Sequence, residues 1–269
     1  MAGALSWPLE SIRDSVAPLL PGFSVELLPV VDSTNSELMR RARSGRTEPV
    51  LLVAQHQTAG RGRLGRHWLG TGVQPGAKLP ALTFSLGMLM SAADWSGLSL
   101  AVGWSVAQSL HPDIRLKWPN DLWWRDRKLA GILIETVNWG SRTASLYVVV
   151  GVGINLQPPN AAGLSMAPAG LNELRPDLDA AAALERVAAP LVQTIRTFEA
   201  RGFAPFQTGF NAVDALARVP VVLSDGMQGV AQGVDAGGAL LVQTAQGLVR
   251  VTSSEVSVRP QPGPGYGHL

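Results

Sequence analysis

The order of apolar and polar positions predicts buried strands that alternate with amphipathic helices. Nearly unbroken apolar runs at 50–54, 81–88 and 145–156 are rich in Val and Leu and have the length of buried strands. Between the last two runs, Leu98, Val102, Val106 and Leu110 recur every four residues, as on one buried face of a helix. A second stripe covers residues 184–198, where Pro190 predicts a kink or a division into two helices.

The first part of the chain predicts a short helix at 9–20, a strand at 23–31 and a second helix. This second helix is expected to begin in the sequence DSTNSE, because Thr34 and Glu37 have the spacing of a capping box with Thr34 at the N-cap. We expect it to stop near Gly45. Capping explains the Ser, Thr and Asn residues, but a helix start can also hold a small polar ligand, so both interpretations stay open.

The last part of the chain changes to short strands separated by glycine-containing turns. The expected strands are 219–223, 229–234, 239–244, 247–251 and 256–259. Asp225-Gly226, Gly237-Gly238 and Gln246-Gly247 supply turn residues between them. This pattern is typical of a small β-barrel, and the Pro- and Gly-rich end at 261–269 is expected to be loose.

Composition narrows the classes of protein to which these elements can belong. The 269 residues are 46% apolar and 16% charged, so the chain can bury a sizeable core in one large and one small domain. The net charge of +2 is too small to indicate a nucleic-acid binder, and the absence of cysteine excludes disulfides and thiolate chemistry. The uncharged stretch 95–112 is interrupted by Ser and Gln, so we expect a buried helix and no membrane span.

A glycine- and arginine-rich loop follows the predicted strand at 50–54. Glycine lets the backbone turn tightly, and arginine presents a permanently charged planar fork to carboxylate or phosphate. Six residues make up the pattern: Gly60, Arg61, Gly62, Arg63, Gly65 and Arg66. The loop therefore predicts an anion site, with a flexible solvated loop or nonspecific nucleic-acid binding as the alternatives.

Two further stretches carry candidate chemistry. Only Lys78, Lys117 and Lys128 are lysines among 22 basic residues, which indicates positions where a compact point charge is needed. The last two fall in the segment 117–128, which begins with KWPND at 117–121 and forms either the wall of a site or an ordinary solvated hairpin. The third stretch, GVGIN at 151–155, places glycines inside a strand, where another group approaches the backbone closely.

Together these motifs resemble the biotin protein ligases over nearly the whole chain. The matching segments are DSTN at 32–35, QTAGRGRLGRHW at 57–68, KWPND at 117–121, DRKLAGIL at 126–133 and GVGIN at 151–155. The resemblance implies an α+β fold of the class II synthetase type, with a mixed β-sheet backed by helices and a C-terminal SH3-like barrel. The implied domains are a catalytic domain at 1–216, the barrel at 217–260 and a flexible tail at 261–269.

The resemblance also implies residue roles. Biotin would be bound by Ser33, Thr34, Asn35, Gln57, Gly60, Arg61, Gly62, Arg63, Lys128, Gly131, Gly151 and Gly153. ATP would be bound by Arg63, Arg66, Trp68, Lys117, Asn120, Lys128 and Asn155. Arg63 and Lys128 would act in catalysis between the biotin carboxylate and the α-phosphate. Asp121 would orient Lys128 or bind Mg²⁺, and it is the one candidate metal ligand.

The implied reaction has two steps. Biotin and ATP with Mg²⁺ form biotinyl-5′-AMP and pyrophosphate, and a lysine of a biotin carboxyl carrier protein, the acetyl-CoA carboxylase subunit, then displaces AMP. Members that repress transcription carry an extra N-terminal DNA-binding domain, for which this chain has no room, so we expect a cytoplasmic ligase with no DNA or membrane partner. An exposed edge strand could form the interface of a homodimer or dock the carrier protein. Closure of 61–69 and 157–170 over ligand is expected to exclude water.

The chain departs from the family pattern in two places. The connection 69–80 is longer than usual, and 157–174 contains no aromatic side chain to stack on adenine, which leaves Met166 or Leu171. Three other functions remain to be weighed. These are a lipoate ligase of the same fold, a non-enzymatic sensor of biotin or nucleotide, and an RNA-binding protein that uses the Arg-Gly loop.

Overall fold

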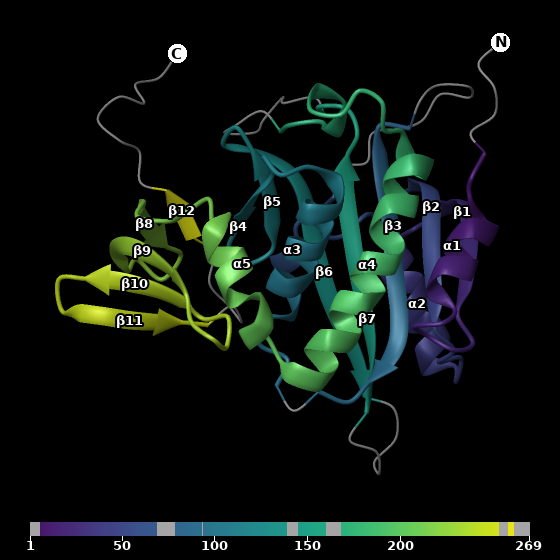
Figure 1. Ribbon diagram of the computed structural model, residues 1–269, viewed down its shortest axis with the longest axis horizontal. Helices are drawn as coiled ribbons and strands as arrows, with labels where there is room; N and C mark the ends of the chain where they lie inside the picture. Colours follow the sequence, from purple (N-terminus) through teal and green to yellow (C-terminus); the bar gives the residue numbers. More distant parts are fainter. Residues whose placement is uncertain are drawn as a thin grey trace.

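The computed structural model describes residues 6–68, 79–92, 94–138, 145–159, 168–252 and 258–260. Within these ranges the chain forms two β-sheets, and helices cover both faces of the larger one (Figure 1). The helices are α1 (Leu9–Val16), α2 (Thr34–Arg43), α3 (Leu98–Leu110), α4 (Ala180–Arg201) and α5 (Gln207–Ala212). Short 3-10 turns lie at Arg63–Gly65 (η1), Leu171–Glu173 (η2) and Ala204–Phe206 (η3).

The larger sheet has seven strands in the order β1-β2-β3-β7-β6-β5-β4. Its strands are β1 (Ser24–Val31), β2 (Val50–Gln57), β3 (Ala81–Met90), β4 (Arg115–Lys117), β5 (Asp121–Trp124), β6 (Arg127–Asn138) and β7 (Leu146–Asn155). Only β1 and β2 pair in parallel, and the other neighbours are antiparallel. The sheet is therefore mixed, as predicted, and most of the DRKLAGIL motif at 126–133 lies in β6.

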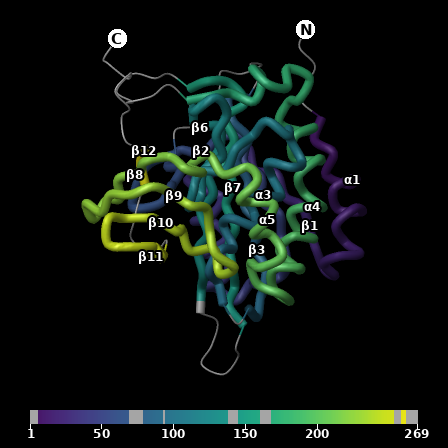
Figure 2. Tube along the Cα trace, turned by 60° about the vertical axis from the view of Figure 1, so that its left-hand side comes forward, coloured from purple at the N-terminus to yellow at the C-terminus, as the bar shows by residue number. Residues whose placement is uncertain are grey.

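The central strands are apolar throughout because both of their faces are buried. In β7, Val148 and Val150 join the core under α1, α3 and α4, whereas Tyr147 and Val149 join a second core under α2. In the turned view of Figure 2, α3 and α4 again lie together on one side of the sheet. This two-sided burial explains why these strands lack the polar alternation of a half-exposed sheet. None of the described helices is long and apolar enough to cross a membrane.

The predicted cap of α2 is wrong by one residue. Ser33, with extended backbone, is the N-cap, and its Oγ accepts a 3.4 Å hydrogen bond from the Ser36 amide. Thr34 is already helical and directs its amide to Gln57 Oε1 at 2.7 Å. Glu37 does not close a capping box but forms ion pairs with Arg40 and Arg41. Long-range partners therefore displaced the local capping pattern.

The stripe at 184–198 belongs to one helix. Helix α4 runs from Ala180 to Arg201 with Pro190 inside it, so of the two predicted alternatives, a kink or two helices, the division into two helices is wrong. Asp179 caps its start by accepting a hydrogen bond from the Ala182 amide at 2.9 Å. A long buried face, which includes Leu184, Leu191 and Phe198, stabilises the helix beyond the loss of one backbone hydrogen bond at proline.

The smaller sheet packs against the β4–β5 end of the larger one. Its antiparallel strands, in the order β11-β10-β9-β8-β12, are β8 (Pro220–Leu223), β9 (Gln228–Val234), β10 (Leu240–Thr244), β11 (Gly247–Val251) and β12 (Val258–Pro260). Trp118, fully buried, donates from Nε1 to the Gly238 carbonyl at 3.1 Å. The Leu116 amide donates to the Val213 carbonyl at 2.9 Å. The KWPND segment is therefore fixed from both sides. The predicted domain limits at 216 and 260 stay predictions, and 261–269 lies outside the described residues.

A buried carboxyl group at this junction predicts a pH effect on stability. Asp214 is 9% exposed, and burial raises its pKa from 3.8 to about 6. Because the folded chain holds this proton more tightly than the unfolded chain, the free energy of unfolding should fall as pH rises from about 4 to 6. The loss should be on the order of 2–3 kcal/mol.

The Asp214→Asn variant tests this expectation. Asparagine keeps the oxygen that accepts the Leu216 amide hydrogen bond at 2.9 Å but cannot ionise. We expect the variant to be more stable than the wild type above pH 6 and to lose the decline between pH 4 and 6. Urea unfolding at pH 4.5 and 7.5 measures both values. If the free energy of unfolding changed equally between these two pH values in both proteins, Asp214 would not be the group responsible for the decline.

Candidate active site

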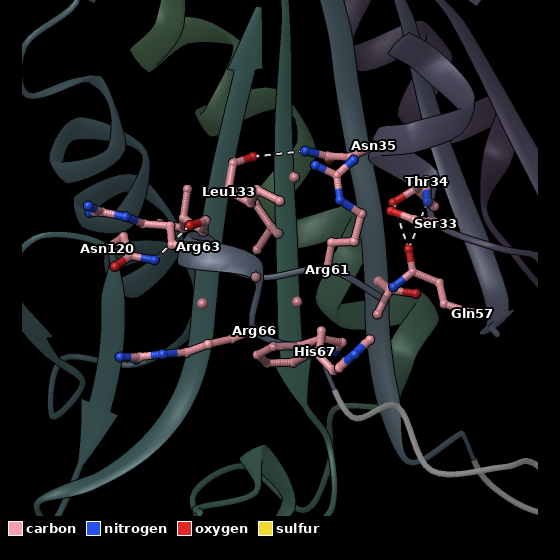
Figure 3. A pocket seen from close by; sticks show the side chains of 18 of the residues that line it. Ser33, Thr34, Asn35, Gln57, Arg61, Arg63, Arg66, His67, Asn120 and Leu133 are labelled. Carbon is pink, nitrogen blue, oxygen red and sulfur yellow. Dashed lines mark hydrogen bonds between the residues drawn. The ribbon is translucent and has the colours of Figure 1, made fainter. Parts of the chain in front are cut away.

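A cavity opens on the larger sheet between the start of α2, the glycine-arginine loop and strands β3, β5, β6 and β7 (Figure 3). Its lining combines neutral hydrogen-bonding groups, arginines, one lysine and several glycines. The lining residues are Ser33, Thr34, Asn35, Gln57, Arg61, Gly62, Arg63, Arg66, His67, Trp68, Thr83, Phe84, Asn120, Asp121, Lys128, Gly131, Ile132, Leu133, Gly151, Val152 and Gly153. The five separate motifs of the sequence thus contribute to one cavity.

The glycine-arginine loop is a small hairpin. The Trp68 amide donates to the Gly60 carbonyl at 2.9 Å, and the Gly62 amide donates to the Arg66 carbonyl at 2.7 Å. At its tip, Leu64 and Gly65 have φ of 56° and 71°. Two successive left-handed residues suit a tight hairpin turn, and glycine adopts this conformation without strain. The backbone of this hairpin therefore directs its arginines to different sides of the cavity.

One side of the cavity is cationic. In Figure 3, Arg63 and Arg66 both extend toward the side on which Asn120 lies. Lys128 Nζ lies 2.7 Å from Asp121 Oδ1, so the lysine is held at the cavity by an ion pair. Burial lowers the pKa of the Arg63 guanidinium, yet arginine stays charged at neutral pH. These groups form a site that attracts anions.

Lys117 and Asn155 lie behind this side and do not line the cavity. Lys117 Nζ lies 4.9 Å from the centre of the Trp123 ring, and burial lowers the pKa of this lysine. Asn155 is buried, and its Nδ2 donates to the carbonyls of Lys128 at 3.3 Å and Ala169 at 3.1 Å. Asn155 therefore fixes the backbone that carries Lys128.

The opposite side is neutral and densely hydrogen-bonded. Asn35 Nδ2 donates to the Leu133 carbonyl at 3.1 Å and to Glu135 Oε2 at 2.9 Å. Arg61 points toward Asn35, away from Arg63, and forms a 2.5 Å ion pair with the other oxygen of Glu135. Because Arg61 is paired in this way, the cationic charge of the cavity is concentrated on the side of Arg63 and Lys128.

Gly151 and Gly153 leave space for the neighbouring side chains Asn35 and Trp68, which would collide with the Cβ atom of any other residue at these two positions. A Cβ built on Gly151 would lie 2.1 Å from Asn35 Oδ1, and one on Gly153 would lie 2.5 Å from the Trp68 ring. The Trp68 ring also covers Gly131, at 3.3 Å from a built Cβ. The close approach expected at GVGIN is present, and in this structure the approaching groups are side chains of the protein itself.

The structure gathers most of the residues that the resemblance implied. Gly60, Lys117 and Asn155 are the implied residues outside the cavity lining. Gly60 instead faces the Trp68 carbonyl, 2.7 Å from a built Cβ. Sequence reasoning missed Ser85 and Glu135, which support the site. The sequence did hold a signal for Ser85. Thr83 and Ser85 are polar residues two positions apart in an otherwise apolar strand, so they lie on the same face of that strand.

Metal ligands are sparse. Among the described residues no group of three or more His, Asp or Glu side chains comes together, and Asp121 is the one carboxylate in the described cavity lining. This set is too small for a metal site made by the protein alone, but one carboxylate fits a Mg²⁺ ion that arrives with substrate phosphates.

Comparison with known proteins shows the family to which this chain belongs. Residues 27–155 match the Biotin/lipoate A/B protein ligase family, and residues 220–259 match the Biotin protein ligase C terminal domain. The chain is 34% identical over 255 residues to the bifunctional ligase/repressor BirA of Escherichia coli, covering 89% of this chain and 75% of that protein. The chain belongs to the biotin protein ligase family. The predicted membership, with its ligase activity, is thereby confirmed.

Two further similarities support the same conclusion. The biotin--[acetyl-CoA-carboxylase] ligase of Mycobacterium tuberculosis is 31% identical over 266 residues, covering 91% of this chain and 93% of that protein. The solved structure of the biotin protein ligase from Aquifex aeolicus in complex with biotin and ATP superposes with a TM-score of 0.71. It is 28% identical, and the match covers 88% of this chain and 99% of that one. The predicted α+β fold class is confirmed, including the small C-terminal antiparallel sheet.

Proposed function

We propose that this ligase joins biotin to one lysine of a biotin carboxyl carrier protein in two steps. Biotin and ATP first give biotinyl-5′-AMP and pyrophosphate, and the carrier lysine then displaces AMP. The observation that carries the proposal is the division of one cavity into a neutral hydrogen-bonding side and a cationic side. Such a cavity matches a neutral ring system whose chain ends in a carboxylate next to a nucleotide phosphate.

The neutral side would hold the biotin rings. Ser33, Thr34 and Gln57 supply hydroxyl and amide groups there, and Asn35 and Arg61 are tied to Glu135 behind them. Gly62, Gly131 and Gly153 keep the backbone open to the ligand tail, with Trp68 as the adjoining wall. Gly60 and Gly151 act indirectly, because each accommodates another part of the site.

The cationic side would bring two anions together. A carboxylate and a phosphate at 4 Å repel by roughly 4 kcal/mol at an effective dielectric of 20. Arg63 and Lys128 would neutralise both and stabilise the charge that grows on the α-phosphate in the transition state. Asp121 holds Lys128 in place at 2.7 Å, and a lysine point charge can follow the reacting oxygens as they move.

The remaining phosphates would meet Arg66 and Asn120, and Lys117 would add positive charge from behind the cavity lining. Asn120 is fixed by a hydrogen bond from Nδ2 to the Ile132 carbonyl at 2.8 Å, so its amide oxygen is oriented by the sheet. Mg²⁺ would arrive with ATP and could be held by phosphate oxygens together with Asp121, where it would supply positive charge. Asn155 would act from behind through the Lys128 backbone.

The partner and the setting follow from the same chemistry. The acceptor would be the carrier domain of acetyl-CoA carboxylase, and cytoplasmic ATP would supply the energy. Strand β1 forms one edge of the larger sheet and so could pair with a carrier or with a second copy in a homodimer. Closure of 61–69 and 157–170 stays a prediction, since residues 69 and 160–167 lie outside the described residues.

A direct assay tests the proposed function. The purified protein is mixed with biotin, ATP, Mg²⁺ and a biotin carboxyl carrier domain, and intact-mass spectrometry follows the carrier. We expect the mass of one biotinyl group on one lysine and pyrophosphate release that requires biotin. A carrier with that lysine changed to arginine should remain unmodified. Modification with lipoate in preference to biotin, or the absence of pyrophosphate, would overturn the proposal.

A further inference from the structure

Ser85 lies directly behind the neutral side of the cavity and is completely buried on β3. Its Oγ lies 2.6 Å from Asn35 Oδ1 and 2.7 Å from Thr34 Oγ1. It does not line the cavity, whereas both of its partners do. Ser85 therefore can reach a ligand only through these two residues.

The protons in this cluster can be assigned from the groups that surround it. Asn35 Nδ2 already donates to Leu133 and Glu135, which fixes the amide orientation and leaves Oδ1 facing Ser85 as an acceptor. An amide oxygen cannot donate a hydrogen bond, so Ser85 must donate its single hydroxyl proton to Asn35 Oδ1. The 2.7 Å contact between the two hydroxyls then requires Thr34 to donate to Ser85.

This assignment determines what Thr34 offers to a ligand. With its proton committed to Ser85, Thr34 Oγ1 presents only lone pairs and can accept a hydrogen bond but not donate one. Gln57 Oε1 is a second acceptor in reach of the Thr34 hydroxyl, at 3.2 Å, but the 2.7 Å contact with Ser85 is shorter and needs this proton because Ser85 donates its own to Asn35. Gln57 Nε2 donates to no acceptor within the described residues and stays available to a ligand.

We infer that Ser85 is a specificity-determining positioning residue, which makes Thr34 an obligate acceptor beside the Gln57 amide donor. The inference rests on the proposed function. An acceptor next to a donor complements a cyclic urea such as that of biotin, which offers an N–H group beside a carbonyl. The dithiolane ring of lipoate has neither group, so binding it would leave both protein groups unpaired, and such mismatches are strongly disfavoured in buried sites.

A double-mutant cycle separates this role from simple core packing. Biotin affinity is measured by calorimetry without ATP for the wild type, Ser85→Ala, Thr34→Val and the double variant. We expect each single change to weaken biotin binding on the order of tenfold. The double variant should lose less affinity than the sum of the two single losses, because part of the effect of Ser85 is exerted through the Thr34 hydroxyl. Additive losses would overturn the inference and leave the proposed function intact.

Controls distinguish the remaining outcomes. Ser105→Ala removes an equally buried serine hydroxyl on α3, outside the cavity, and should leave biotin affinity within about twofold. Should Ser85→Ala fail to fold, Ser85→Cys keeps a weak donor of similar size, and its cycle with Thr34→Val gives the same comparison. Undetectable biotin binding by the wild type would instead refute the proposed function.

Discussion

Lys128→Ala should reduce biotinyl-adenylate formation by on the order of a thousandfold while the protein stays folded. The variant removes the compact charge that Asp121 holds at the cavity, and it leaves that carboxylate beside the two anions that must meet. The turnover number should fall much more than the affinity for biotin, because the charge that Lys128 neutralises is greatest in the transition state. Biotin-dependent exchange of pyrophosphate into ATP measures the first step alone.

Two companion variants make this result interpretable. Arg127→Ala removes the neighbouring cation, which is paired with Glu173 at 2.7 Å outside the cavity, and should retain activity within about threefold. Lys128→Ala with Asp121→Asn should recover part of the loss, since the stranded negative charge is also removed. Near-normal turnover of Lys128→Ala would show that this lysine does not act between the carboxylate and the phosphate.

Gly151→Ala should weaken biotin binding strongly and lower stability together. Its new methyl group would lie 2.1 Å from Asn35 Oδ1, so the Asn35 side chain must leave its position. Asn35 would then lose Ser85, Leu133 and Glu135, and buried groups left without partners cost about 1–3 kcal/mol each. We expect at least a hundredfold loss of biotin affinity and a melting temperature lower by several degrees, followed by calorimetry and thermal unfolding.

A paired substitution tests the cause of this loss. Asn35→Ala with Gly151→Ala removes the clash, so it should recover melting temperature but not biotin affinity. Gly103→Ala, inside α3, serves as the control, because a Cβ there would meet only the ends of flexible Leu and Ile side chains of the facing strands, at 3.3 Å or more. It should leave binding unchanged. Full affinity in Gly151→Ala would show that the Asn35 position is unimportant for the site.

The extent to which sequence anticipated the site depends on how local each feature is. Gly60 to Arg66 could be interpreted directly, because glycine freedom and arginine charge are properties of the residues themselves. The order of five motifs then identified a family and its fold. The cap of α2 was predicted one residue late, because the Thr34 amide is held by Gln57, 23 residues away in the chain.

The sequence by itself determined most of the strands and helices, the family, and the set of charged groups that could meet two anions. Only the tertiary structure decided that Ser85 supports Asn35 across 50 residues and that Glu135 joins Asn35 to Arg61. The reason is strand register. Gly151 pairs with Ser85 on one side and with Leu133 on the other, so the Asn35 amide lies over Gly151 and can bond to both neighbours. Hydrophobic periodicity specifies which face of a strand is buried, but partners this distant are set by how the strands align.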